Sequence, residues 1–210
     1  MNTFELFEFF NDRMSAYQFL SRLYKTAPDA DFINALLAMD TEYQTPLNTV
    51  IKAMRDVDRE QLCIDLAAEY NRVFLGMSAN PIAPYESVYT SPDHLLMQDA
   101  RDEVLALYRA EALAPNKDLR IPEDHLAIEF DFMAFLCKKA AQACSENDQA
   151  GIDEYTAKQR DFLIKHLLVW VPDMLNDMEE RVFTDFYRCI CTITREQLEI
   201  DRDWALETSK

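Results

Sequence analysis

The residues best suited to chemistry in this chain stand close together, between positions 122 and 129. Asp124 and His125 follow Pro122, and Glu129 comes four positions after His125. An imidazole and a carboxylate at that spacing share one helix face, where they could act as acid and base or as two ligands of a metal ion. The other interpretation is a histidine that hydrogen-bonds locally at the start of a helix. Asp124 could also accept hydrogen bonds from a cationic ligand such as a guanidinium group.

A second group of candidate residues lies toward the end of the longest irregular stretch of the chain, residues 76–91. Tyr85, Glu86 and Tyr89 belong to it. A long loop in a compact helical domain is usually functional or mobile, and a Pro-Tyr-Glu turn could anchor an apolar peptide segment and a charge together. In the other interpretation, Tyr85 only covers the core.

The remaining candidate groups predict neither a metal site nor nucleophilic catalysis. The five cysteines are scattered, and Cys189-x-Cys191 is too tight for the usual pair of zinc ligands. With only 2 glycines, the chain cannot build a glycine-rich phosphate loop. We therefore expect buried cysteines, no enzyme activity, no metal and no cofactor. His166 stands among leucines and is predicted to be a packed core histidine, whereas His94 is predicted to be exposed.

The charge balance restricts the partners. The chain has 210 residues, of which 49% are hydrophobic, and its 21 basic and 38 acidic residues give a net charge of -17. Such a surface repels nucleic acid and anionic membranes and attracts a basic partner. The N-terminal residues lack the features of a signal peptide, and no apolar run approaches the length of a membrane span. We therefore expect a cytoplasmic protein.

Helical periodicity and capping residues position these groups. Apolar residues recur every three or four positions from residue 4 to residue 25, and the same pattern follows Thr45-Pro46 and Asp58. Gly76 is expected to end the helix that Asp58 begins. These patterns predict an all-α bundle of about nine or ten helices.

Three prolines predict further helix starts, and a linker predicts that the chain is divided into two domains. Pro92, Pro122 and Pro172 are each expected to open a helix, and the helix after Pro122 is expected to be central and buried on two sides. Residues 113–121 read as a linker. The expected domains are therefore residues 1–112 and 122–210, joined by a hinge at 113–121, and the two can also pack as one globular domain.

Three segments, in this order and spacing, resemble the TorD/DmsD/NarJ family of redox-enzyme maturation chaperones. Residues 69–89 contain Glu-Tyr-Asn-Arg-Val-Phe-Leu-Gly and Pro-Tyr-Glu-Ser-Val-Tyr, residues 122–133 read Pro-Glu-Asp-His-Leu-Ala-Ile-Glu-Phe-Asp-Phe-Met, and residues 166–172 read His-Leu-Leu-Val-Trp-Val-Pro. The resemblance implies an all-helical fold with a hinge just before the Asp-His helix, either as a monomer or as a domain-swapped dimer. It also implies a cytoplasmic chaperone that binds the twin-arginine signal peptide and the apo-form of a molybdopterin oxidoreductase. Such a chaperone assists cofactor insertion and delays export until folding is complete.

The resemblance also suggests which residues bind the peptide. The matching positions lie at the Asp-His turn, in the loop around Tyr85, and on two earlier helices: Tyr24, Phe74, Tyr85, Glu86, Ser87, Pro122, Asp124 and His125. A weak guanine nucleotide interaction is suggested by family analogy alone. The chain departs from the family pattern at Met77, Tyr85 and Ala112, where the family has Pro, Trp and Gly. Two alternatives are a helical hydrolase or metal-dependent enzyme centred on Asp124 and His125, and an acidic interaction scaffold without a signal-peptide role.

Overall fold

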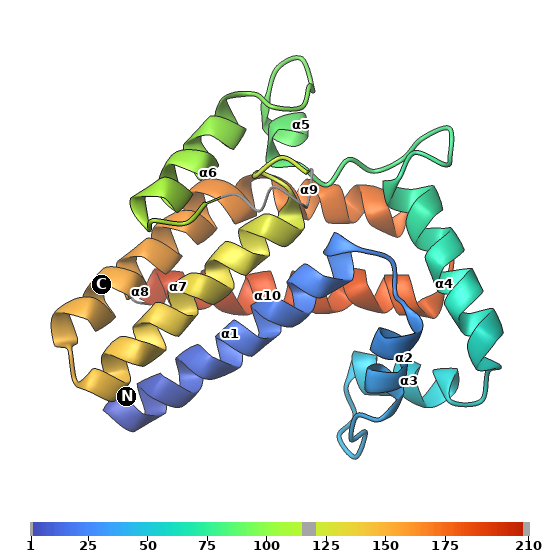
Figure 1. Cartoon of the computed structure of the whole chain (residues 1–210), viewed down its shortest axis with the longest axis horizontal. Helices are drawn as coiled ribbons and strands as arrows, with labels where there is room; N and C mark the ends of the chain where they lie inside the picture. The colour runs from blue at the N-terminus through green and yellow to red at the C-terminus, as the bar shows by residue number, and fades with distance from the viewer. Residues whose placement is uncertain (1, 115–120, 208–210) are drawn as a thin grey trace. The chain divides into compact units, whose positions relative to one another are not determined.

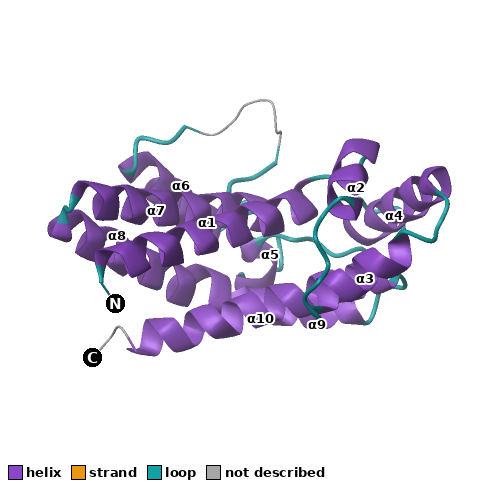
Figure 2. Cartoon of the chain, turned by 90° about the horizontal axis from the view of Figure 1, so that it is seen from below, coloured by secondary structure: helices purple, strands orange, loops and turns teal. Residues whose placement is uncertain are grey.

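The predicted all-α fold is confirmed. The computed structural model describes residues 2–114 and 121–207, and in these residues it contains ten α-helices and one short π-helical segment, with no strand (Figure 2). Among the same residues, no helix combines the length and the apolar character needed to cross a membrane. The elements are α1 Thr3–Lys25, α2 Ala30–Leu37, α3 Pro46–Met54, α4 Arg59–Phe74, α5 Glu86–Thr90, α6 Asp99–Ala110, α7 Leu126–Glu146, α8 Gln149–Phe162, η1 (the π-helical segment) Leu163–Leu167, α9 Leu168–Glu179 and α10 Asp185–Glu207.

The chain forms two compact units, and each draws on segments that are distant in sequence. The first, called unit 1, consists of residues 1–25, 84–171 and 200–210, and unit 2 consists of residues 26–83 and 172–199. Helices α9 and α10 therefore contribute to both units. The division at 113–121 into an N-terminal and a C-terminal subdomain stays a prediction, and residues 115–120 of that hinge lie outside the described residues.

The core of unit 1 is built on the pairing of α1 with α7, and α8 packs on α7 as well (Figure 1). Phe10, Tyr17 and Tyr24 recur every seven positions on α1 and are all buried, as expected for one apolar helix face. Tyr17 and Tyr24 contact the ring of Phe130 on α7, with ring centroids 5.6 and 6.0 Å apart. Helix α7 also buries Phe132 on another face, so its predicted central position is confirmed.

A buried polar contact holds the C-terminal part of α10 in unit 1. The Arg13 guanidinium lies 2.9 Å from the Asp201 carboxylate, and both side chains are almost completely buried. The Tyr17 hydroxyl donates to the same carboxylate, and the Trp204 ring lies 3.9 Å from the Arg13 guanidinium carbon. Because a buried charge needs a partner, these contacts fix α10 against α1.

In unit 2, the start of α10 is capped by a carboxylate from α4. Glu69 is buried, and it accepts hydrogen bonds from the backbone N–H groups of Phe183 and Thr184. Arg72, one turn later on α4, places its guanidinium carbon 3.9 Å from the Phe183 ring. Further along α10, the Tyr187 hydroxyl donates to the carbonyl of Leu66 at 3.0 Å. A negative charge at a helix N-terminus is favourable, so α4 positions α10.

The predicted caps at Thr45 and Asp58 are confirmed. Each stands at an N-cap and accepts a hydrogen bond from the backbone N–H group three residues later, and Asp29 caps α2 in the same way. Gly76 follows α4 with a φ of +74°, the left-handed conformation that glycine adopts without strain. Side chains that cap a helix within its first turn are therefore predictable from sequence at Thr45 and Asp58.

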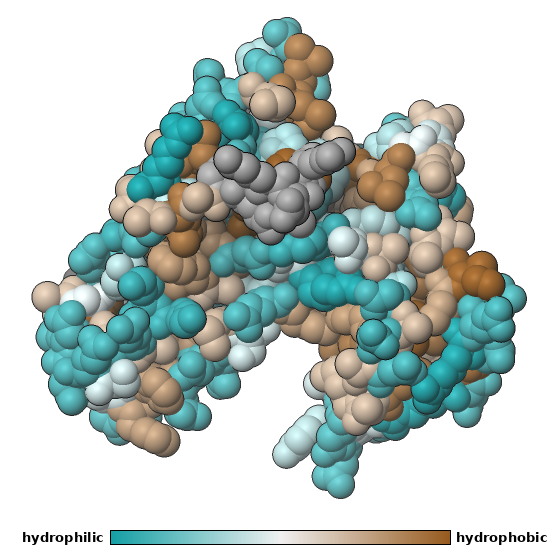
Figure 3. Space-filling model, in the orientation of Figure 1, coloured by the Kyte–Doolittle hydropathy of each residue, from teal (hydrophilic) through white to brown (hydrophobic). Residues whose placement is uncertain are grey.

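The predicted helix start at Pro92 is wrong. Residues 91–98 form a loop, α6 begins only at Asp99, and the short helix α5 precedes the loop. His94 and Met97 have φ values of +52° and +60°, and such left-handed residues interrupt a helix. His94 is exposed, as predicted. The loop also exposes apolar side chains, visible at the top of Figure 3, and these belong to Leu95, Leu96 and Met97.

The predicted helix start at Pro172 is also wrong, because Pro172 lies inside α9. A proline removes the hydrogen bond to the carbonyl four residues earlier, which here belongs to Leu168. Leu168 is the residue at which the π-helical segment η1 gives way to α9. The lost bond therefore falls at a junction where the hydrogen-bond pattern changes anyway, and the helical run continues through the proline.

Candidate functional site

The structure brings the two predicted clusters together in unit 1. The segment before α5 and the turn before α7 form an isolated antiparallel bridge. The Glu86 N–H group donates to the carbonyl of Asp124 at 3.0 Å, and the Leu126 N–H group donates to the carbonyl of Pro84 at 2.9 Å. Two segments nearly forty residues apart are thus joined by their backbones at the start of α7.

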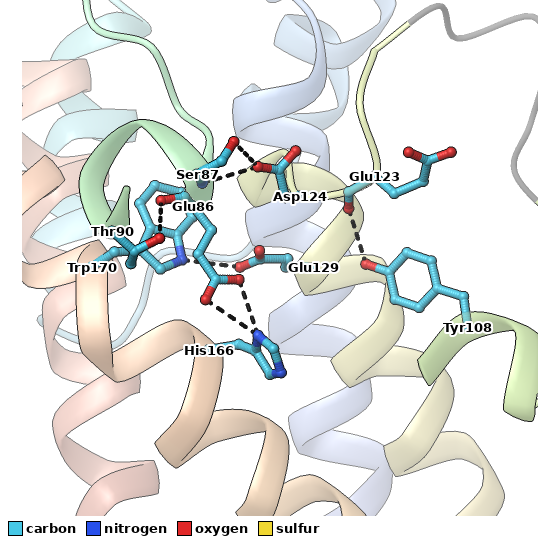
Figure 4. A network of polar contacts seen from close by, with 9 residues as sticks. All are labelled: Glu86, Ser87, Thr90, Tyr108, Glu123, Asp124, Glu129, His166 and Trp170. Atoms are coloured by element: carbon cyan, nitrogen blue, oxygen red, sulfur yellow. Dashed lines mark hydrogen bonds and ion pairs between the residues drawn. The ribbon is translucent and has the colours of Figure 1, made fainter. Parts of the chain in front are cut away.

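Asp124 joins α5 to this turn through its side chain. Its Oδ2 atom accepts hydrogen bonds from the Ser87 backbone N–H group, at 2.9 Å, and from the Ser87 hydroxyl (Figure 4). Asp124 and Ser87 are both fully buried. Ser87 lies in the first turn of α5, where backbone N–H groups lack partners within the helix. Asp124 therefore caps α5 from a distant part of the chain.

His125 is the N-cap of α7. Its Nδ1 atom accepts a hydrogen bond from the Ala127 N–H group at 3.1 Å, and its ring meets the Tyr85 ring edge-on, with centroids 4.9 Å apart. Burial, followed by the positive charge of Lys25, lowers the pKa of His125 to about 4. The neutral imidazole, protonated on Nε2, is therefore the form that caps the helix at neutral pH.

Pro122 does not open α7, contrary to the prediction. It lies in the turn that precedes the helix, where its carbonyl accepts a hydrogen bond from the His125 N–H group. The helix begins at Leu126 because the His125 side chain provides the cap. The neighbouring Glu123 attaches this turn to α6, through a 2.6 Å ion pair with Arg101.

Glu86 reaches a partner that the sequence does not suggest. Its carboxylate lies 3.0 Å from the Nδ1 atom of His166, and both side chains are buried. His166 is packed in the core as predicted, because it stacks on Phe162 with centroids 4.9 Å apart. The prediction missed its polar partner. A polar partner could have been expected from the leucines around His166, because a buried imidazole needs a hydrogen-bond partner.

Glu129 completes the buried network, which Figure 4 shows together with Trp170. The Trp170 indole N–H group donates to Glu129 at 3.2 Å, and Tyr89 packs on the indole with centroids 5.6 Å apart. Burial, followed by the negative charge of Glu86, raises the pKa of Glu129 well above its usual range. Glu129 is therefore held in its protonated form more readily than an exposed glutamate.

The other two predicted residues, Tyr24 and Phe74, each pack on another aromatic ring. Tyr24 is fully buried in α1, where it packs on Phe130. Phe74 belongs to unit 2, at the end of α4, where it packs on Tyr70 with centroids 5.1 Å apart. The structure thus gathers Tyr85, Glu86, Ser87, Asp124 and His125 in unit 1, whereas Phe74 belongs to unit 2.

The buried contacts of this site position the segment around Tyr85. Among the described residues, no three His, Cys, Asp or Glu side chains are grouped so that they could hold a metal ion. Four of the five cysteines are buried, as expected. Burial raises the pKa of the Cys137 and Cys191 thiols to about 12, which disfavours the nucleophilic thiolate. The buried network fixes the segment around Tyr85, and Tyr85 itself is half-buried.

Comparison with known proteins decides the family. The model of the family described as "Nitrate reductase delta subunit" matches residues 37–176, more than half of the chain. The chain belongs to the TorD/DmsD/NarJ family. The resemblance predicted from the three motifs is therefore confirmed.

Curated relatives named chaperone protein TorD are 27–31% identical to this chain over the aligned residues. The chaperone protein TorD of Aliivibrio salmonicida is 27% identical over 183 residues, which cover 87% of this chain and 78% of the relative. The chaperone protein TorD of Vibrio cholerae is 31% identical over 150 residues, which cover 71% and 66% of the two chains. That of Photobacterium profundum is 28% identical over 152 residues, covering 72% and 69%.

Proposed function

We propose that this chain is a cytoplasmic chaperone for a molybdopterin oxidoreductase. It binds the twin-arginine signal peptide and the apo-form of that enzyme, assists cofactor insertion and delays export until folding is complete. The observation that carries the proposal is the family match over residues 37–176, together with relatives that are named chaperone protein TorD. Whether the chain works as a monomer or as a domain-swapped dimer stays a prediction.

The charge of the chain supports a basic, partly apolar ligand. A twin-arginine peptide has a basic end followed by an apolar run, and the chain carries a net charge of -17. Opposite net charges mainly raise the association rate, whereas burial of the apolar run supplies affinity. High ionic strength is therefore expected to lower the association rate constant of the peptide by a larger factor than it lowers the affinity.

Five of the eight predicted binding residues take one of two roles in this proposal. Tyr85 is half-buried and is assigned to direct contact with the peptide, whereas Asp124, Ser87, Glu86 and His125 are buried and position the segment around Tyr85. No catalytic role is assigned to Asp124 or His125, since their Oδ2 and Nδ1 atoms accept backbone N–H groups.

Calorimetric titration with a synthetic twin-arginine leader peptide of a molybdopterin oxidoreductase, and co-expression with that enzyme, test the proposal. We expect binding with a dissociation constant on the order of micromolar or below, and co-purification of the apo-enzyme. The control is the same peptide with both arginines replaced by glutamine. If the leader does not bind and the apo-enzyme does not co-purify, the proposed function is wrong.

A further inference from the structure

A groove in unit 1 lies outside the residues predicted to bind a ligand. It is formed by α6, α7, α8 and η1 and encloses about 430 Å³, a volume typical of ligand sites. Its apolar wall consists of Leu107, Ala110, Phe132, Leu136, Ala157 and Phe162. Groups of this kind can receive several apolar side chains of a peptide.

The carboxylate of Glu111 lies in the groove at a position that is electrostatically unfavourable for an anion. Glu111 is the C-cap of α6, where the negative end of the helix dipole disfavours an anion. Only 8% of its side chain is exposed. Its partners are the Lys158 ammonium at 2.5 Å and the Tyr155 hydroxyl at 3.4 Å. A nearly buried carboxylate in such a place needs a cation.

The other charges of the groove leave an excess of negative charge. Lys158 is shared between Glu111 and Glu154, both at 2.5 Å, and Lys165 pairs with Asp161 at 2.8 Å. The groove thus contains three carboxylates and two ammonium groups. Because both lysines are already paired, the groove favours a ligand that brings a cation rather than an anion.

We propose that this groove binds a peptide segment that packs apolar side chains against Phe132 and Phe162 and places a cationic side chain on Glu111. The inference rests on the proposed function, because a signal peptide with a basic end and an apolar run has this chemistry. The bound cation takes the place of the Lys158 ammonium beside Glu111, and Lys158 keeps Glu154 as its partner. The groove is then a subsite of the leader, distinct from the segment around Tyr85.

Filling the groove tests the apolar part of the proposal. The probe is a fluorescent synthetic peptide with two adjacent arginines and an uncharged run of about 12 leucine and alanine residues, followed by anisotropy. Ala157→Trp places an indole in the groove from a partly exposed position, and Ala150→Trp adds the same group to an exposed position of the same helix. We expect Ala157→Trp to weaken binding at least tenfold and Ala150→Trp to leave it unchanged. Ala110→Trp, from the exposed side of α6, repeats the test should Ala157→Trp unfold.

A charge exchange tests the role of Glu111. Glu111→Gln is expected to weaken binding of the arginine peptide about tenfold, as for loss of a charge-assisted hydrogen bond. The same substitution should not affect a peptide whose arginines are replaced by neutral citrulline. Asp153→Asn is the matched control, since it removes one negative charge from an exposed position of α8 outside the groove, and it should leave both peptides unaffected.

The outcomes separate this inference from the proposed function. If the wild-type chain binds the peptide and both groove-filling variants bind it equally well, the groove is not the site, and the proposed function stands. If the wild-type chain binds no such peptide, both are wrong. If Ala157→Trp changes the sedimentation of the chain but not peptide binding, the groove is an interface between two copies, and the inference is again wrong.

Discussion

The capping role of His125 makes the stability of unit 1 sensitive to mild acid. The pKa of this residue falls from 6.5 to about 4 in the folded chain. Since the folded pKa is the lower one, the unfolded chain binds more protons between these two values, and stability rises with pH across that window. The contribution is complete above pH 6.5 and is lost as the pH falls toward 4. Protonation would also convert the Nδ1 acceptor into a donor that faces the Ala127 N–H group.

The size of the effect follows from the pKa difference. A difference of about 2.5 pKa units corresponds to about 3.4 kcal/mol of unfolding free energy, at about 1.36 kcal/mol for each unit. Between pH 7.5 and pH 5.5, the same linkage removes about 1.3 kcal/mol. His125→Asn removes this term, because asparagine also provides a side-chain acceptor at an N-cap but does not titrate.

Urea unfolding at pH 7.5, 6.5 and 5.5 measures the difference. We expect the His125→Asn chain to be less stable than the wild-type chain at pH 7.5, because it loses the ring contact with Tyr85. It should regain about 1.3 kcal/mol relative to the wild-type chain by pH 5.5. His94→Asn is the matched control, since it removes an imidazole from an exposed position, and its pH dependence should follow the wild-type chain. Parallel pH dependences of the wild-type and His125→Asn chains would refute the reasoning.

Three further predictions concern stability. Ala112→Gly should raise the unfolding free energy by about 1 kcal/mol in urea titrations, because Ala112 has a φ of +57° and is exposed; no gain would show that the residue is not strained. Asp201→Ala should lower the unfolding free energy by about 3–5 kcal/mol in the same assay, because Arg13 is left as an unpaired buried charge. A loss below about 1 kcal/mol, which is typical of a surface ion pair, would contradict this account. Glu129→Gln retains an acceptor for Trp170 and resembles the protonated acid. Because the folded pKa of Glu129 is raised, the wild-type chain loses stability as pH rises above the unfolded value, so the variant should gain on it by up to about 1.4 kcal/mol for each pH unit. Thermal unfolding at pH 5 to 8 checks this, and a constant difference would refute it.

The part of the fold that sequence predicts well is the part that local contacts determine. Asp58 caps α4 through a bond to a residue three positions away, and this signal lies within a single turn. The same holds for the periodic apolar face of α1. The helix starts predicted at prolines were wrong because proline is tolerated at the first position of a helix but does not by itself start one. At α7, the side chain of His125 decides where the helix begins.

The parts of the site that sequence could not predict depend on distant contacts. Helix α5 has no side-chain cap of its own, and its partner Asp124 is 37 residues away. Glu86 and His166 are 80 positions apart. No local pattern encodes such pairs, so the sequence indicated Asp124 and His125 as important while leaving open what they contact. The three ordered motifs did include residues 84–89, 122–133 and 166–171, which the fold brings together in unit 1.

The contact between Arg13 and Asp201 has a consequence for the timing of synthesis. Unit 1 needs a helix from the beginning of the chain and the last turns of α10, so its core cannot close while residues near 201 are still inside the ribosome. Until then, Arg13 and the apolar face of α1 lack the partners that bury them in the folded chain. A nascent copy of this chain is therefore expected to expose this apolar face until residue 201 has left the ribosome.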